Sequence, residues 1–247
     1  MHDSFLEALN HLQGSFMSMG INVSEQIYQA IESFKNKDDK LAEQVIKHDE
    51  NINSDEINLE KEALNLIALQ QPVANDFRSI ISFLKASSDL ERIGDHAATI
   101  SKETIRMKKD NIGEFKDVNK IISKMEVKLR SMLEATLDAF LRGDESSARL
   151  TAQDDILIDK QFVIARNIVT NEIKQNTKQI PLVGSYLYTI RLLERIGDHI
   201  VNLDEQVVYS HSGKIIELNP GKLKPDLIRK ELQAESGSGK SKSKQNK

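Results

Sequence analysis

Four acidic side chains stand in a heptapeptide that occurs twice without change. The sequence LERIGDH fills positions 90–96 and returns at positions 193–199, an offset of 103 residues. Each copy carries a glutamate and, four residues later, an aspartate: Glu91, Asp95, Glu194 and Asp198. On a helix this spacing places both carboxylates on one face, one turn apart. Their repulsion destabilises the helix by roughly 0.2–0.5 kcal/mol per pair, and a bridging cation would remove it.

Each copy also places a glycine, Gly94 or Gly197, inside the expected helix. A glycine there costs about 1 kcal/mol relative to alanine, and it allows another helix or a ligand to approach the backbone. Because both copies keep the paired acids and the glycine despite their cost to helix stability, we predict a metal site in each half. The chain has no cysteine, so the available ligands are oxygens, which suit Mg²⁺, Ca²⁺, Mn²⁺ or iron.

An ion-paired surface is the competing interpretation of these acids. Arg92 stands three residues before Asp95, and Arg191 stands three residues before Glu194. Pairs of this kind are common on helices and contribute only about 0.3–0.5 kcal/mol. The duplication of acids and glycine together favours the metal site. The neighbouring His96 and His199 point about 100° away on the helix, so we expect a hydrogen bond or a helix–helix contact from them, not metal binding.

Aligning the two halves adds acids on a second helix. At an offset of 106 residues Asp49 matches Asp155, and Asn53 matches Asp159. Two helices of each half would then face one site, and the further metal ligands predicted are Asp49, Asp155 and Asp159. Asn53 leaves the first site one negative charge short, which predicts weaker or altered metal content there.

Apolar residues follow a helical period through most of the chain, with five breaks. These fall near residues 36–39, 70–72, 108–113, 142–145 and 176–181. Strand-like alternation is hard to find. We therefore expect an all-α fold of six long helices.

The repeat divides these helices into two pseudo-symmetric three-helix bundles that lie side by side. We expect the first repeat over residues 1–110 and the second over 111–218. We expect residues 219–247 to be a polar, largely disordered tail, since residues 236–247 contain only Ser, Gly, Lys, Gln and Asn. This lysine-rich basic tail is left out of the fold.

Composition narrows the function classes. The 247 residues carry a net charge of −4, which does not indicate a nucleic-acid partner. No apolar run approaches the ~20 residues of a membrane span, and the N-terminus lacks the pattern of a signal peptide. We expect a cytoplasmic protein. No nucleophile–base arrangement or phosphate-binding loop is present, which favours a protein that is not an enzyme.

With these motifs the chain resembles the PhoU family, whose hallmark is an E(D)-x-x-x-D motif in each of two three-helix repeats. The resemblance covers residues 1–218. It implies a cytoplasmic regulator of phosphate uptake and phosphate-starvation signalling that binds multinuclear metal clusters through the motif acids. It also implies contact with the ATPase subunit of the phosphate ABC transporter and with a sensor histidine kinase. We expect iron, manganese, magnesium or zinc as the metal, and a homodimer that reaches the membrane only through its partners.

Two alternatives remain open. Metals held by carboxylates can activate water, so a metal-dependent phosphohydrolase or another carboxylate-bridged metalloenzyme is possible. A helical adaptor without metal is the other. Elemental analysis of protein purified without chelator distinguishes the adaptor from the metal-binding proteins.

Overall fold

The computed structural model describes residues 2–109, 113–175 and 179–219. These residues form six helices: α1 (His2–Asn36), α2 (Asp39–Gln70), α3 (Ala74–Lys109), α4 (Lys116–Arg142), α5 (Glu145–Gln175) and α6 (Ile180–Ser212). The prediction of an all-α fold is confirmed. Of the predicted tail, residues 220–247 lie outside the described part of the chain. None of the helices described has a stretch long and apolar enough to cross a membrane.

The helix ends follow from the local chemistry of the breaks. Asp38 caps α2, because its side chain accepts hydrogen bonds from the backbone N–H groups of Lys40 and Leu41. Gly143 ends α4 with a φ of 62°, a conformation that glycine adopts without strain. Pro181 stands in the first turn of α6. Proline is tolerated there because backbone N–H groups in the first turn have no hydrogen-bond acceptor within the helix.

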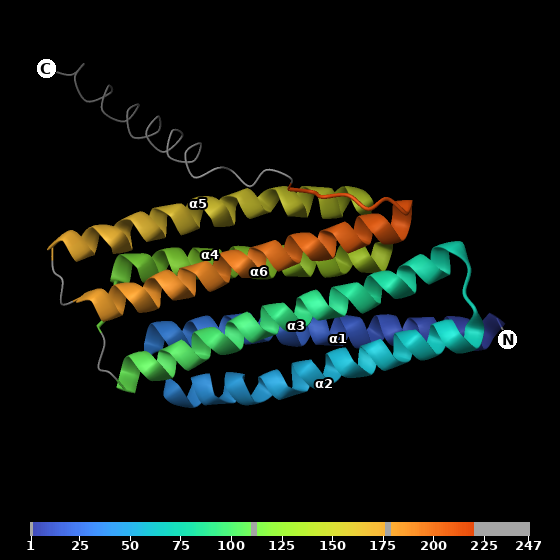
Figure 1. Cartoon of the computed structure of the whole chain (residues 1–247), viewed down its shortest axis with the longest axis horizontal. Helices are drawn as coiled ribbons and strands as arrows, with labels where there is room; N and C mark the ends of the chain where they lie inside the picture. Colours follow the sequence, from blue (N-terminus) through green and yellow to red (C-terminus); the bar gives the residue numbers. More distant parts are fainter. Residues whose placement is uncertain (1, 110–112, 176–178, 220–247) are drawn as a thin grey trace, which may run out of the picture.

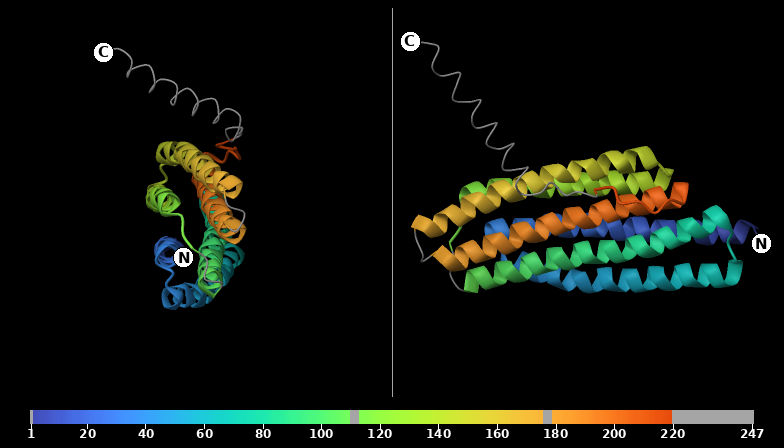
Figure 2. Two further views of the ribbon diagram at one scale, coloured as in Figure 1. Left: turned by 90° about the vertical axis from the view of Figure 1, so that its left-hand side faces the viewer. Right: turned by 45° about the horizontal axis from the view of Figure 1, so that its top comes forward.

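The helices form two three-helix groups that lie side by side (Figure 1). The first group contains α1, α2 and α3, and the second contains α4, α5 and α6. Seen from the end, α2 and α5 lie at opposite extremes of the molecule, with α3 and α6 next to each other between them (Figure 2). The packing of α3 on α6 is the most extensive of the described helix pairs, and α1 also contacts α4. The two helices that carry the heptapeptide are therefore neighbours.

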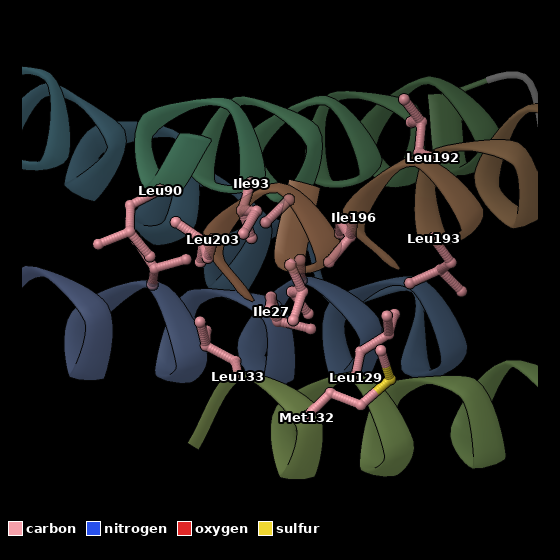
Figure 3. Packing of buried hydrophobic residues seen from close by; sticks show 14 of the residues in the cluster. Ile27, Leu90, Ile93, Leu129, Met132, Leu133, Leu192, Leu193, Ile196 and Leu203 are labelled. Carbon is pink, nitrogen blue, oxygen red and sulfur yellow. The ribbon is translucent and has the colours of Figure 1, made fainter. Parts of the chain in front are cut away.

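The apolar residues of the heptapeptide build the contact between the two groups. Leu90 and Leu193 open the two copies and are fully buried, as are Ile93 and Ile196. Figure 3 shows these side chains among α3, α6, α1 and α4, with Ile27 of α1 in the same cluster. The repeated motif thus has a packing role at its apolar positions, which leaves its acids and glycine to be explained.

Candidate metal centres

In the first repeat, Asp49 of α2 lies against Gly94 of α3. A Cβ at Gly94 would stand 3.5 Å from Asp49 Oδ1 and 3.3 Å from Ile52 Cγ2, so the absent side chain allows the two helices to approach closely. Gln26 of α1 donates a hydrogen bond of 3.1 Å to the same carboxylate oxygen. The second helix of the repeat therefore faces the motif, as the alignment predicts.

The acids of the first site repel one another. Burial raises the pKa of Glu91, and the charges of Asp95, Glu56 and Asp49 raise it further, while Arg92 lowers it. Burial also raises the pKa of Asp49, and the charge of Asp95 adds to that rise. A cation placed among these carboxylates would relieve both the burial cost and the repulsion.

Arg92 neutralises this cluster only weakly. Its Nε lies 3.8 Å from Glu91 Oε2, and its Nη1 lies 4.0 Å from Asp95 Oδ2. The Arg92 side chain is 61% exposed, and pairs of such length at the surface contribute little. The ion-paired surface is therefore a poor account of the first site.

Glu56 of α2 is an acid of the first site that sequence analysis missed. Its charge contributes to the raised pKa of Glu91, which places it within electrostatic reach of the motif. Its counterpart in the second repeat, 106 residues later, is Phe162. Because the second repeat has an aromatic residue at this position, comparing the repeats does not identify Glu56 as a site residue.

In the second repeat the motif glycine lies closer to the aligned aspartate than in the first. A Cβ at Gly197 would stand 2.3 Å from Asp155 Oδ1, a separation that real side chains do not tolerate. Asp155 and Asp159 of α5 are both buried, one turn apart, and Glu194 of α6 is 5% exposed. The glycine of the motif again faces the aligned aspartate of the preceding helix.

Glu194 is bound by a cation, which distinguishes it from Glu91. Arg191 donates a hydrogen bond of 2.7 Å from Nη1 to Glu194 Oε1. The guanidinium of Arg191 also lies 5.9 Å from the centre of the Phe162 ring, within reach of a cation–π contact. The first repeat has Ser88 at the position of Arg191. The two sites are therefore unequal, because the guanidinium of Arg191 would compete with a metal ion for Glu194 in the second site.

A cavity of about 560 Å³ lies beside the second site. Asp155 and Asp198 line it, so the structure brings these two predicted site residues together. The cavity is also lined by two further acids, two amides and an apolar residue: Glu205, Glu217, Asn202, Asn219 and Val201. Burial raises the pKa of Glu205, and the charge of Glu217 raises it further. The second site thus opens onto a space whose charged lining is acidic.

The segment after α6 forms part of this lining, which sequence analysis did not foresee. The backbone N–H of Leu218 donates a hydrogen bond of 2.9 Å to Glu205 Oε1. The side-chain amide of Asn219 donates one of 3.0 Å to the carbonyl of Ala152. These bonds hold the segment against α6 and α5. It follows both repeats, so no internal alignment marks its residues.

The acids lie near one another without forming a closed cage. Among the residues that the structure describes, no three His, Cys, Asp or Glu side chains are gathered closely enough to hold a metal ion. Mg²⁺ is commonly held by one or two carboxylates, with water completing its shell. The first-repeat acids fit that mode, because they are partly buried, repel one another and are paired only loosely with Arg92, whose Nε lies 3.8 Å from Glu91 Oε2.

His96 and His199 form the helix–helix contact expected of them. Their ring centres lie 5.4 Å apart across the α3–α6 contact. Nδ1 of His199 lies 2.8 Å from Asp89 Oδ1, which also accepts a hydrogen bond from Asn202. Burial lowers the pKa of His96 to about 4, and the charges of His199 and Arg195 contribute. His96 is therefore neutral at neutral pH.

Replacing Gly197 with alanine is expected to disturb the second site more than the same change at Gly94 disturbs the first. The new methyl group would meet Asp155 Oδ1 at 2.3 Å, whereas at Gly94 the nearest atom is Gln26 Oε1 at 3.0 Å. Because the Asp155 carboxylate must turn away, we expect Gly197→Ala to weaken Mn²⁺ binding at the second site by about tenfold or more, the scale of displaced ligand geometry. Calorimetric titration measures this, and equal Mn²⁺ affinity in Gly197→Ala and the parent would contradict it.

Asp204 of α6 is a fully buried acid near the second site that sequence analysis also missed. Burial raises its pKa well above the ordinary aspartate value of 3.8, a hydrogen bond with Thr136 lowers it, and the charges of Glu205 and Asp155 raise it. Asp204 Oδ1 lies 2.8 Å from Thr136 Oγ1. Its Oδ2 has no hydrogen-bond partner among the described residues. The folded chain therefore retains a proton here that the unfolded chain releases at lower pH.

Asp204→Asn is expected to stabilise the chain increasingly as the pH rises. Above pH 3.8 Asp204 ionises in the unfolded parent but keeps its proton in the folded parent, so the free energy of unfolding of the parent falls as the pH rises. Asparagine has no such proton, and the variant does not lose this stability. The variant and the parent should differ little near pH 4. At pH 7.5 the variant should be more stable by on the order of 1 kcal/mol. Urea unfolding at both values measures the difference, and a gap that shrinks with rising pH would contradict the assignment.

Two kinds of sequence comparison connect the chain with known proteins. A family model described as PhoU domain matches it twice, at residues 16–104 and 122–207. The chain is 34% identical, over 219 residues, to the phosphate-specific transport system accessory protein PhoU homolog of Streptococcus pneumoniae serotype 4, covering 89% of this chain and 100% of that protein. It is also 34% identical to PhoU homolog 1 of Thermotoga maritima, covering 86% and 91%.

Solved structures agree with the fold. The crystal structure of PhoU from Pseudomonas aeruginosa has a TM-score of 0.80 at 31% identity and covers 85% of this chain and 100% of that chain. The phosphate transport system regulatory protein PhoU from Streptococcus pneumoniae has a TM-score of 0.79 at 33% identity, covering 86% and 99%. The two matched segments correspond to the two three-helix groups. The chain is a member of the PhoU family.

Proposed function

We propose that this chain is a cytoplasmic regulator of phosphate uptake and phosphate-starvation signalling. The observation that carries the proposal is a PhoU domain that occurs twice, with the same acidic heptapeptide in each copy. Relatives that align over most of the chain are named phosphate-specific transport system accessory proteins. An accessory role in phosphate transport follows from that likeness.

Metal ions bound by the repeated acids would organise the surface of the regulator. The ligands of the first site are Asp49, Glu91 and Asp95, and those of the second are Asp155, Asp159, Glu194 and Asp198. These carboxylates lie on neighbouring helices, so a cation held by them would reduce their repulsion and would favour the packing of α2 on α3 and of α5 on α6. Carboxylate oxygens suit iron, manganese, magnesium or zinc. The repulsion within the first site supports this assignment.

The partners of the regulator would be the ATPase subunit of the phosphate ABC transporter, a sensor histidine kinase and a second copy of the chain. Support comes from large apolar side chains on the outer helices. Ile57 and Leu64 of α2 are about half exposed, as is Leu157 of α5, and Leu150 of α5 is more exposed still. Exposed apolar residues on long helices are typical of surfaces that contact other proteins.

Catalysis on phosphoesters is less well supported than regulation. The cavity at the second site is lined by Glu205 and Glu217 in addition to two site aspartates. Glu205 and Glu217 are not among the proposed ligands, so they would keep the lining acidic even beside a bound cation and would repel an anionic phosphoester. The regulator therefore accounts better for the acids.

Removing the motif acids tests the proposal. We expect the variant Glu91→Gln, Asp95→Asn, Glu194→Gln, Asp198→Asn to lose bound metal and to lose repression of phosphate-starvation genes in phosphate-rich cells. Elemental analysis of protein purified without chelator measures the first, and a reporter gene measures the second. Capture of the transporter ATPase from the same cells measures the partner contact.

A variant with four exposed glutamates changed to glutamine serves as the control, because it alters the net charge equally away from the sites: Glu7, Glu43, Glu114 and Glu134. It should keep metal and repression. Full metal content in the motif variant would contradict the site assignment. Metal-dependent phosphoester hydrolysis that disappears with the motif acids would support the enzyme instead.

A further inference from the structure

The two ends of the helix bundle are related by the repeat, and one end is filled by aromatic packing. Tyr186 of α6 donates a hydrogen bond of 2.7 Å to Asn119 Oδ1 and accepts one of 3.1 Å from the backbone N–H of Phe115. Its ring lies 5.2 Å from that of Phe115 and 5.1 Å from that of Phe34. Aromatic rings and satisfied polar groups thus close this end.

At the other end, leucine replaces phenylalanine, glutamine replaces asparagine and phenylalanine replaces tyrosine at the equivalent positions. At the offset of 106 residues, Leu9 is the counterpart of Phe115 and Gln13 that of Asn119. At the offset of 103 residues, Phe83 is the counterpart of Tyr186. This end has its own ring cluster of Phe16, Phe83 and Phe140, but it lacks a ring at the position of Phe115 and a hydroxyl at the position of Tyr186. A cavity of about 400 Å³ lies there, between α1, α3, the α4–α5 turn and the end of α6.

The two ends also differ in the hydrogen bonding of a buried serine, Ser82 at one end and Ser185 at the other. Its counterpart Ser185 accepts a hydrogen bond of 2.8 Å from Arg106 and donates one to the carbonyl of Pro181. Ser82 is fully buried and lines the cavity. Its Oγ has no hydrogen-bond partner among the residues described, although Ser79, one turn earlier, bonds back to its own helix. A buried hydroxyl without a partner is costly unless a ligand or water satisfies it.

The remaining lining consists of donors and apolar groups. Arg142 and His211 supply a guanidinium and an imidazole, and the amides of Gln13 and Asn75 face the same space. Arg78 donates a hydrogen bond to Asn75 Oδ1, which brings a further cation to the rim. Of the residues that the structure describes, no carboxylate lines this cavity, although the chain has 38 acidic residues. The lining is the reverse of the acidic cavity at the second metal site.

We propose that this cavity binds a small tetrahedral oxyanion of the phosphate class. Arg142 would provide the main charge: its Nη2 donates a hydrogen bond to Asp138 on the same helix, but this exposed pair contributes little, and the other guanidinium N–H groups could bind an anion. The hydroxyl of Ser82 would donate to an anion oxygen, the bond that it lacks in the unliganded chain. A free phosphate ion and the phosphate of a phosphomonoester share this chemistry. The proposal does not depend on the metal sites.

Calorimetric titration of the full-length chain with inorganic phosphate, in chelator, tests the proposal apart from any bound metal. We expect saturable binding that is weakened at least about tenfold in Arg142→Gln, the effect of losing one charged hydrogen bond. Ser82→Ala should weaken binding and leave the fold intact, because it removes an unsatisfied group. Sulfate and glycerol phosphate, titrated in parallel, distinguish a free oxyanion from a phosphomonoester.

Leu9→Phe is the most informative variant, because it copies the aromatic ring of the filled end. It should abolish phosphate binding and raise the melting temperature. Ser185→Ala is the matched control at the filled end and should leave binding unchanged. Absence of binding at millimolar phosphate, binding that survives Leu9→Phe, or equal binding of uncharged glycerol would each overturn the proposal.

Discussion

Replacing Leu193 with alanine is expected to lower the free energy of unfolding by about 3 kcal/mol, within the range measured for buried leucines. Leu193 is fully buried where α6 meets the other helices of the core (Figure 3). Its truncation leaves a cavity between the two repeats that the long, straight helices cannot collapse to fill. The melting temperature should fall by roughly 6–12 °C for a chain of this size. Urea and thermal unfolding followed by circular dichroism measure both quantities.

Leu157→Ala is the matched control for this change. Leu157 lies on α5 and is 46% exposed, so the same truncation there should cost less than about 1 kcal/mol. Leu90→Ala, at the equivalent position of the first repeat, should match Leu193→Ala. A loss below 1 kcal/mol at Leu193 would show that the two repeats do not share one core.

The helical scaffold was predictable because its signals are local. A period of 3.6 residues marks each helix, and the breaks carry residues such as Asp38 and Gly143 whose capping chemistry is evident in the sequence. Duplication then supplied long-range information that one helix cannot contain. It indicated that Asp49 and Asp155 belong opposite the motif, and the structure places Asp49 beside Gly94 and Asp155 beside Gly197.

The sequence predicted unequal sites from Asn53, but it did not reveal the contributions of Glu56 and Arg191, because these lie at positions where the two repeats differ. Glu56 and Phe162 share a position, as do Ser88 and Arg191. In an alignment of the two repeats, such mismatched pairs cannot be distinguished from substitutions without functional effect. Their meaning appears only when the side chains are placed, with Glu56 acting on Glu91 and Arg191 bound to Glu194.

We expect the first site to bind Mn²⁺ about tenfold more tightly than the second, which reverses the order suggested by Asn53. In the first site Glu56 adds a negative charge, and Arg92 remains 3.8 Å from Glu91. In the second a cation must displace Arg191, which is 2.7 Å from Glu194. That charged hydrogen bond contributes about 1.5–3 kcal/mol when buried, and the half-exposed arginine reduces this to about 1.4 kcal/mol, a factor of ten.

Variants that retain one site each measure the two affinities separately. Glu194→Gln with Asp198→Asn leaves the first site, and Glu91→Gln with Asp95→Asn leaves the second. In the latter background Arg191→Ser should strengthen Mn²⁺ binding by about tenfold, because it restores the residue type of the first repeat and frees Glu194.

Lys120→Ser removes an equal charge from α4, where Lys120 pairs with the exposed Asp117. It should leave the affinity of the second site unchanged. If Arg191→Ser and Lys120→Ser have the same small effect, Arg191 does not compete with the metal. The asymmetry would then rest on Glu56 alone, and Glu56→Gln should equalise the two sites.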